Sequence, residues 1–328
     1  MDWTRILAQV AGEIIAPTTA AYALAAIGLN IHFGLTGLLN MGQAGFMLLG
    51  AYGFAIATIG GWPLWAAVLA ALAASAVFAI ILGIPTLKLR GDYLAIVTIA
   101  AAEIVRLIGR STSMTGITGG NAGLAGDSYK STFQDLSPFA DGNFALGPLS
   151  YSNNLSNSWW LRLVGWTVVG LACLFVWRLM NSPWGRVLKG VREDEDAVRS
   201  LGKNVYSYKM QSLVLGGALG ALAGILFVLP RAVQADSLGR PVTFYIWTIL
   251  LLGGAATVFG PVLGSILLWT VLIFIKTVMR EIVPASVMRP EQIETFGWVL
   301  VGISLMLLVI FRPQGILGDK KELAIHDR

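Results

Sequence analysis

Long apolar segments alternate with short polar segments along this chain. Residues 63–84, 210–229 and 296–311 contain no charged side chain, and residues 159–180 contain two arginines, both near the ends. A helix needs about 20 mostly apolar residues to cross the hydrocarbon core of a bilayer. Arginines near the ends of such a helix extend their charged groups to the lipid headgroups. These four segments therefore predict transmembrane helices.

Five further apolar segments are shorter or more polar, namely 10–33, 44–60, 93–109, 244–256 and 260–275. The fourth of them ends at Gly253-Gly254 and is followed by Gly260-Pro261, which interrupts a regular helix. Broken helices are tolerated in membranes only where their backbone faces protein or water. The pattern predicts an all-α integral membrane protein, a polytopic bundle of about nine transmembrane helices with some broken or re-entrant helices.

The distribution of lysine and arginine predicts the orientation of this bundle. Residues 181–207 contain five basic residues. Residues 86–92 and the tail after 311 also contain basic residues. The segment 111–158 has a single lysine and is rich in Ser, Gly and Asn. Because basic residues concentrate in cytoplasmic loops, we predict that 111–158 is an external loop. The N-terminus is then outside, and one permease domain (1–318) ends in a cytoplasmic tail (319–328).

Composition agrees with a membrane protein and excludes most other classes. The chain is 56% hydrophobic and 12% charged, against about 25% charged residues in soluble domains. One cysteine and two histidines offer no disulfide and no metal cluster. The sequence contains no phosphate-binding G-x-x-x-x-G-K-[ST] loop and no catalytic constellation. We predict a protein that is not an enzyme, has no cofactor or metal of its own and binds no nucleic acid.

The most informative polar segment is 182–202, S-P-W-G-R-V-L-K-G-V-R-E-D-E-D-A-V-R-S-L-G, between two predicted spans. Pro183 suits the start of a helix and Gly202 suits its end. An acidic run precedes three apolar residues that fall on one helical face, Ala197, Val198 and Leu201. The pattern predicts a short amphipathic helix lying against the membrane. It is either a knob that a cytosolic protein grips in a groove or an ordinary solvated loop.

The segment 182–202 is similar to the cytoplasmic loop of the Liv-type permeases of ABC importers for branched-chain amino acids. Further motifs resemble the same family in the same order, at 39–52, 87–106, 118–124, 252–264 and 311–318. The resemblance covers residues from about 20 to 318. The long external loop and the final R-P-Q-G resemble the M-type subunit of that family more than the H-type subunit.

This resemblance implies a function and a set of partners. The expected protein is a multi-pass permease subunit in a prokaryotic plasma (inner) membrane, carrying branched-chain or other hydrophobic amino acids. Its expected partners are a homologous H-type permease, two ATP-binding subunits that hold ATP and Mg, an external substrate-binding protein and membrane lipid. The family's ATPase-coupling loop carries over to Gly190, Arg192, Glu193, Asp194, Glu195, Asp196, Ala197, Leu201 and Gly202.

The resemblance leaves the substrate open. Similar permeases carry urea, amides and other small polar solutes. A proton- or sodium-driven secondary transporter is the rival of another class, and it would use Glu103 or Glu13 as a proton relay. Such a carrier does not need the cytoplasmic loop.

Two polar pairs are candidates for the substrate pathway. Glu103 and Arg106 are three residues apart on an otherwise apolar predicted helix, so they can pair on one face. They form either a pathway or gate element or an ion pair that seals a subunit interface, and we favour the second. Asn40 and Gln43 lie in a Gly-rich break. They either line a polar cavity or cap a helix in a simple turn.

Small residues recur every fourth position in one predicted span, at Gly216, Gly220 and Gly224. Such a stripe lets two helix backbones approach closely. We predict helix packing rather than substrate lining for these glycines. The external loop either touches a binding protein or covers the outer mouth of the pathway.

Overall fold

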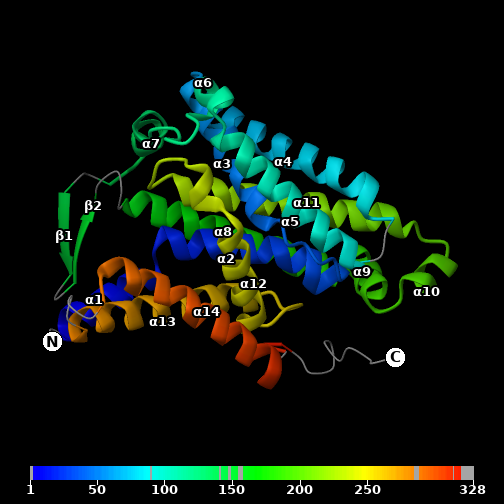
Figure 1. Ribbon diagram of the computed structural model, residues 1–328. Coiled ribbons are helices and arrows are strands. Elements are labelled where there is room, and N and C mark those ends of the chain that lie inside the picture. Colours follow the sequence, from blue (N-terminus) through cyan, green and yellow to red (C-terminus); the bar gives the residue numbers. More distant parts are fainter. Residues whose placement is uncertain are drawn as a thin grey trace.

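The computed structural model describes residues 3–88, 91–139, 142–146, 149–153, 158–283, 288–312 and 314–318. The long helices run along a common direction (Figure 1). Helices α9 and α10 lie at one end of this bundle, while α6, α7 and a β-hairpin lie at the other end. The two ends are called here the α9–α10 end and the α6–α7 end.

The elements follow one another as α1 (Trp3–Ile14), α2 (Pro17–Asn30), η1 (Ile31–Leu35), α3 (Gln43–Ile59), α4 (Leu64–Thr86), α5 (Gly91–Arg110), η2 (Thr112–Met114), α6 (Thr115–Thr118), α7 (Asp127–Gln134), β1 (Gly142–Leu146), β2 (Leu149–Asn153), α8 (Trp159–Asn181), α9 (Pro183–Glu193), α10 (Glu195–Ser200), α11 (Val205–Val228), η3 (Ala235–Leu238), α12 (Arg240–Gly253), α13 (Gly260–Ile282) and α14 (Pro290–Phe311). The predicted all-α class holds for the bundle. Among the described residues its exceptions are the antiparallel hairpin β1–β2 and a single bridge between Leu124 and Val233.

Each of the nine predicted segments contains a helix, and six helices are long and apolar enough to cross a membrane. These six, found within the described residues, are Ile6–Leu35, Leu64–Thr86, Trp159–Asn181, Val205–Val228, Gly260–Ile282 and Glu291–Leu308. The other three are shorter or more charged. Helices α3 and α12 have 17 and 14 residues, and the sequence of α5 includes two acids and two arginines. The count of nine crossings therefore stays a prediction.

Helix α2 forms the centre of the bundle. From Thr19 to Asn30 every one of its residues is buried, and it packs against α11, α13, α8 and α12. Its sequence is rich in alanine, so neighbouring helices approach its backbone closely. Closely packed backbone leaves little room for movement, so α2 is a rigid element to which the polar residues at its end are attached.

The predicted glycine stripe of α11 faces α2, η1 and α3. A Cβ at Gly216 would lie 2.4 Å from the Gly28 carbonyl oxygen, and a Cβ at Gly224 would lie 1.9 Å from the Met47 carbonyl oxygen. At Gly220 the nearest atom would be Nε2 of Gln43, at 2.8 Å. The three glycines therefore lie where helices touch, as expected for a packing stripe.

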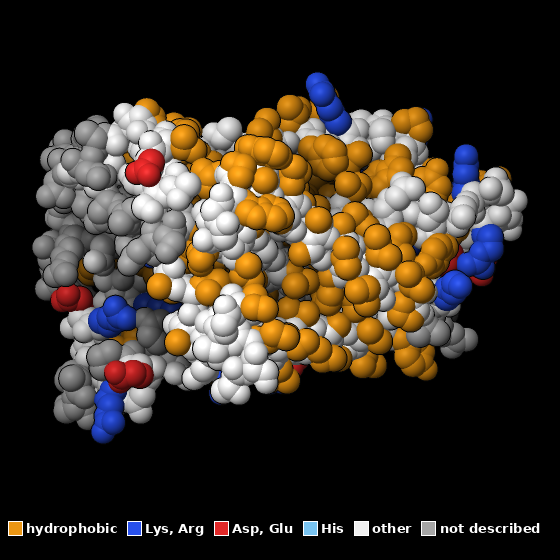
Figure 2. All heavy atoms as spheres, turned by 90° about the horizontal axis from the view of Figure 1, so that it is seen from above, with side chains coloured by type: hydrophobic (Ala, Val, Ile, Leu, Met, Phe, Trp, Pro, Cys, Tyr) orange, Lys and Arg blue, Asp and Glu red, His pale blue; other side chains and the backbone are white. Residues whose placement is uncertain are grey.

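The outer surface of the bundle is apolar between its two ends. Large hydrophobic side chains are exposed on α4, α5, α8, α13 and α14, among them Ile81, Ile104, Leu171, Val271 and Ile310. Figure 2 shows one such face, where hydrophobic side chains cover the middle and most charged side chains lie toward the two ends. A surface of this kind matches the hydrocarbon core of a bilayer.

Two interruptions of regular helix position the polar residues. Helix α2 continues into the π-helical turn η1, and residues 37–42 then run without regular helix to the start of α3. The break predicted after α12 is also present, because Gly254 has φ +113° and Ala256 has φ +62°. Both interruptions expose backbone groups inside the bundle, where side chains or other backbone must satisfy them.

Candidate functional site

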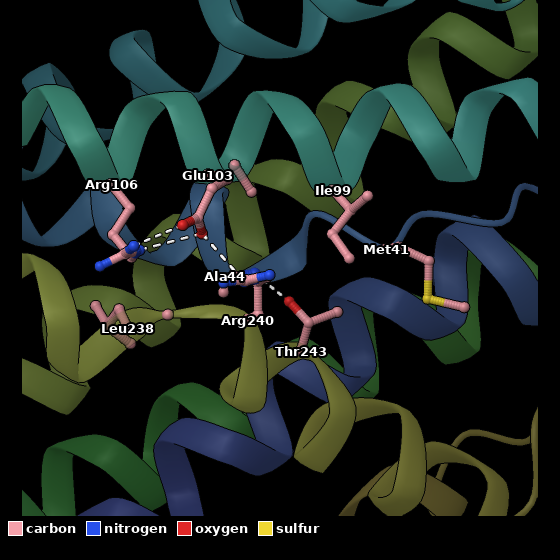
Figure 3. A pocket seen from close by; sticks show the side chains of 10 residues that line it. Met41, Ala44, Ile99, Glu103, Arg106, Leu238, Arg240 and Thr243 are labelled. Carbon is pink, nitrogen blue, oxygen red and sulfur yellow. Dashed lines mark hydrogen bonds and ion pairs between the residues drawn. The ribbon is translucent and has the colours of Figure 1, made fainter.

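A narrow cleft lies between α5, the start of α3, and the segment that joins η3 to α12. It is lined by Met41, Ala44, Ile99, Ala102, Glu103, Arg106, Leu238, Gly239, Arg240 and Thr243. The cleft has a volume of about 10 Å³, which is room for about one water molecule. In Figure 3 the side chains of Glu103 and Arg106 point from α5 toward Arg240 at the start of α12.

The predicted pairing of Glu103 with Arg106 is confirmed. Arg106 donates from Nη2 to Glu103 Oε1 at 2.5 Å and from Nε to Glu103 Oε2 at 3.1 Å. This two-pronged geometry is the strongest form of a guanidinium–carboxylate contact. Arg106 also pairs with Asp236 of η3, and Arg240 Nε lies 3.5 Å from Glu103 Oε2.

The sequence did not single out Asp236 and Arg240, because they follow Arg106 by more than 100 residues and are polar residues in a predicted loop. The only signal was their nearness to the broken helix α12. Charged side chains at membrane depth face protein or water rather than lipid. The α5 face that carries Glu103 and Arg106 packs on η3 and the start of α12 in this chain. A role in the pathway or at a subunit interface stays a prediction.

Asn40 and Gln43 form a buried polar cluster at the break between η1 and α3. Asn40 Nδ2 donates to Gln43 Oε1 and to His32 Nδ1, both at 3.0 Å, and Asn40 Oδ1 accepts from the Gly42 amide at 2.8 Å. Gln43 Nε2 donates to the carbonyl oxygens of Ala25 and Gly216, both at 3.3 Å. Both side chains are fully buried.

These contacts favour a structural role over a cavity lining. Neither Asn40 nor Gln43 is among the described residues that line the cleft, whereas their neighbours Met41 and Ala44 are. The Asn40 carbonyl oxygen also accepts a hydrogen bond from Trp247 Nε1 of α12 at 3.1 Å. The cluster therefore holds the wall of the cleft in place from behind.

Two more polar contacts fix the end of α2 and were not predicted. Asn30 Nδ2 donates to the Thr257 carbonyl oxygen at 2.7 Å, and Asn30 Oδ1 accepts from the Ala256 amide at 2.8 Å. The hydroxyls of Thr36 and Ser212 lie 2.7 Å apart. The polar residues at 30, 32 and 36, within an apolar segment, could have indicated these contacts, because buried polar groups need hydrogen-bond partners.

The segment predicted to couple to ATPases forms two helices rather than one. Pro183 is the first residue of α9, and the Ser182 hydroxyl accepts from the Gly185 amide at 3.2 Å, as expected for a helix start. The chain turns at Asp194, whose carboxylate accepts from the amides of Asp196 and Ala197 at 3.0 and 2.9 Å. Asp194 therefore ends α9 and caps α10.

The expectation that Ala197, Val198 and Leu201 share one face is wrong. Val198 is buried against Val191 and Val205, whereas Ala197 is exposed and Leu201 is 79% exposed. Because Val198 turns inward, the free surface of α9 and α10 combines apolar and acidic side chains. Its exposed acidic side chains include Glu193 at the end of α9, at 72%, and Asp196 of α10, at 88%.

Ion pairs and one backbone contact hold this segment to the bundle. Arg192 Nη1 donates to the Gly34 carbonyl oxygen of η1 at 2.5 Å. Glu195 pairs with Lys209 of α11 and, at 3.0 Å, with Arg199. A Cβ at Gly190 would lie 3.0 Å from Val198 Cγ2, and Gly202 has φ +76° after the end of α10. The predicted coupling residues thus form one packed unit.

Comparison with known proteins identifies the family of this chain. The model of the family described as branched-chain amino acid transport system / permease component matches residues 13–310. The chain belongs to this permease family. The high-affinity branched-chain amino acid transport system permease protein LivM of Salmonella typhimurium is 33% identical over 92% of this chain and 69% of its own. The probable LivM of Methanocaldococcus jannaschii is 25% identical over 91% of each chain.

A solved structure of a putative metal-chelate type ABC transporter in an inward-facing conformation aligns with 91% of this chain and 84% of its own. The identity is 15% and the TM-score is 0.45, which is too low to define a shared fold. Membership of the family and six apolar helices identify the protein as a multi-pass inner-membrane permease subunit of an ABC importer. The prediction of this function from sequence is confirmed.

Proposed function

We propose that this permease carries branched-chain or other hydrophobic amino acids, driven by ATP hydrolysis in partner subunits. It pairs with a second, homologous permease, and two ATP-binding subunits dock at the α9–α10 end. An external binding protein delivers the amino acid to the α6–α7 end. In this arrangement the bundle crosses the membrane about nine times, with the N-terminus outside and the C-terminus in the cytoplasm. ATP and Mg are bound by the partners, and this subunit makes no covalent bond itself.

One observation carries this proposal. Helices α9 and α10, together called the α9–α10 unit, have an exposed outer face and an inner face packed on the bundle. Its outer face combines exposed carboxylates with the exposed Leu201, a composition suited to a groove on another protein. Its inner face is packed by Leu188 and Val191, which are buried. A unit fixed on one side and free on the other transmits a push from a docked subunit to the bundle.

The path of that push is short. Arg192 connects α9 to the carbonyl of Gly34 in η1, and η1 leads directly to the turn that contains Asn40. Asn40 contacts Trp247 of α12 through its backbone. Displacement of α9 therefore reaches the walls of the cleft through contacts inside this chain.

The decisive experiment reverses charge on the free face. The double variant Glu193→Lys with Asp196→Lys keeps the packing of Leu188 and Val191. It reverses two exposed acids and removes their ion pairs with Arg192 and Arg199. We expect loss of transport-coupled ATPase activity in the reconstituted complex, with the permease still folded and inserted. The matched control reverses two exposed acids beyond the other end of the bundle, Glu281→Lys with Glu291→Lys. Unchanged coupling in the first variant contradicts the docking proposal.

Uptake assays with the complex reconstituted in lipid vesicles distinguish the proposed substrate and energy source from the alternatives. Leucine uptake that needs ATP supports the proposal, whereas uptake of urea or an amide alone assigns the permease to a small polar solute. Uptake driven by a proton or sodium gradient without ATP contradicts an ABC importer. Co-purification from native membrane shows whether two ATPases and a second permease accompany this chain.

A further inference from the structure

Five charged side chains form a connected network at the cleft. Besides the contacts of Glu103 and Arg106, Arg110 Nη1 lies 3.5 Å from Asp236 Oδ2. Among the described residues joined by these ion pairs, three arginines face two carboxylates, which leaves one excess positive charge. The side chains of Arg110, Asp236 and Arg240 are 49%, 50% and 62% exposed. The excess positive charge is therefore accessible to an anionic group.

The network lies inside the membrane-embedded part of the fold. Helix α5 has 20 residues, or about 30 Å at 1.5 Å per residue, close to the thickness of the hydrocarbon core. Glu103 and Arg106 lie past its middle, toward the α6–α7 end. Helix α12 has 14 residues, or about 21 Å, so it is too short to span the core by itself.

The chain leading to Arg240 is held in place by the predicted external loop, 111–158. Leu124 and Val233 exchange backbone hydrogen bonds of 2.9 and 3.2 Å, and η3 then packs on α5. At the start of α12, Pro241 has no amide hydrogen and the Val242 amide donates to the Gly239 carbonyl oxygen at 3.0 Å. The bridge and η3 thus connect the segment that contains Leu124 to the lining of the cleft.

The cleft is apolar on the side away from Glu103 and Arg106, where Met41 and Ile99 contribute uncharged side chains to its lining (Figure 3). In Figure 3 Ile99 and Met41 lie to one side of Arg240, and Glu103 and Arg106 lie to the other. A cleft with a positive group, a negative group and an apolar wall matches the three parts of a free hydrophobic amino acid.

We propose that this cleft is a transient binding site for the zwitterionic amino acid during transport. Arg240, supported by Arg106, binds the carboxylate, Glu103 binds the ammonium group, and the apolar side formed by Met41 and Ile99 contacts the side chain (Figure 3). This inference rests on the proposed function and names the site and the chemistry by which this chain recognises its substrate.

The structure shows the closed form of the site. A volume of about 10 Å³ does not admit an amino acid, so α5 and the start of α12 must separate first. The Arg240–Glu103 contact is the longer of the contacts to Glu103, at 3.5 Å, and the Arg240 side chain is 62% exposed. Arg240 is therefore free to move first. Ion pairs that must be exchanged also keep binding weak, as passage through a transporter requires.

The first test is Arg240→Gln in the complete transporter, with both permeases, the ATPases and the binding protein in lipid vesicles. Leucine is the probe. We expect leucine transported per ATP hydrolysed to fall about tenfold or more, because one charged contact to the carboxylate is lost. ATP hydrolysis is measured in the same vesicles, and an equal loss of hydrolysis and uptake, with their ratio unchanged, contradicts the proposed site. The control is Arg280→Gln, an exposed arginine on α13.

The second test measures occupancy without transport. The single native cysteine, Cys173, is replaced by serine, and Ile99→Cys places a thiol in the cleft. In the complex without binding protein, leucine at high concentration should slow modification of this thiol. Leucinamide, which keeps the ammonium group and lacks the carboxylate, should slow it less. The difference between the two compounds should vanish in the Arg240→Gln background.

The outcomes distinguish a failure of this binding site from a failure of the proposed function. If the wild-type complex takes up leucine, but Arg240→Gln transports normally and leucine does not protect the thiol, this inference fails and the proposed function stands. If the wild-type complex takes up no leucine, the proposed function fails and the inference fails with it. Should Arg240→Gln not assemble, Arg240→Lys retains the charge, and the protection test on Ile99→Cys decides alone.

Discussion

Arg192 donates a 2.5 Å hydrogen bond from Nη1 to the carbonyl oxygen of Gly34 and so connects the α9–α10 unit to the π-helical turn η1. The Arg192 side chain is only 11% exposed. A Cβ at Gly37 would lie 3.2 Å from Arg192 Cγ, so the backbone beyond η1 packs directly on this side chain. A charged hydrogen bond in a partly buried place is stronger than one between neutral groups. The contact is therefore suited to transmit force.

Replacing Arg192 by alanine removes this connection and leaves α9 otherwise packed through Leu188 and Val191. We expect Arg192→Ala to retain at least half of the basal ATPase activity of the complex and to lose most of its transport. The physical reason is that a push on α9 no longer reaches η1. The measurement compares leucine uptake with ATP hydrolysis in the same vesicles.

The matched control for that variant is Arg186→Ala, because Arg186 lies on the same helix and is exposed. It removes an equal charge without touching η1. If both variants lose transport equally, the loss arises from charge near the membrane surface and not from the Gly34 contact.

Asn40→Leu tests the buried polar cluster. The substitution leaves Gln43 Oε1 and the Gly42 amide without their present partner, and each buried group left without a hydrogen bond costs about 1–3 kcal/mol. We expect a drop in the apparent Tm of the purified permease of several degrees. Asn181→Leu serves as control, since Asn181 is exposed and donates to the Trp177 carbonyl within its own helix. Equal shifts in Tm for both variants would contradict a special role of the cluster.

Much of the fold could be predicted from the sequence because a membrane helix requires a long apolar segment. Each of the nine apolar segments contains a helix, and Gly253-Gly254 correctly marked a break. Local pairing was also readable, since Glu103 and Arg106 are neighbours on one helical face. These features depend on spacing along the chain, which the sequence displays directly.

Features that depend on distant residues could not be predicted in this way. The contact of Arg192 with Gly34 joins residues 158 positions apart. Val198 was predicted to share one helical face with Ala197 and Leu201, whereas it is buried and they are exposed. Each miss comes from tertiary packing, which overrides the period of a single helix.

Replacing glycine by alanine should affect stability differently in the stripe of α11 and on α8. At Gly224 a Cβ would lie 1.9 Å from the Met47 carbonyl oxygen, so Gly224→Ala forces α11 and α3 apart and lowers the apparent Tm. At Gly170 of α8 a Cβ meets nothing within 4 Å. Because alanine is favoured over glycine within a helix by roughly 0.5–1 kcal/mol, Gly170→Ala should leave the apparent Tm unchanged or raise it. A loss of stability at Gly170 and none at Gly224 contradicts the packing interpretation.

Thiol labelling tests the proposed orientation of the bundle. In a background where Cys173 is replaced by serine, Leu201→Cys lies on α10 and Ile117→Cys on α6, at opposite ends (Figure 1). We expect a membrane-impermeant reagent to label Ile117→Cys in intact cells and Leu201→Cys only after the membrane is opened, because basic segments stay in the cytoplasm. Both positions are exposed, at 56% and 79%, so poor access within the protein does not explain an absence of label. Labelling of Leu201→Cys in intact cells places α10 outside and removes the basis for ATPases docking on it.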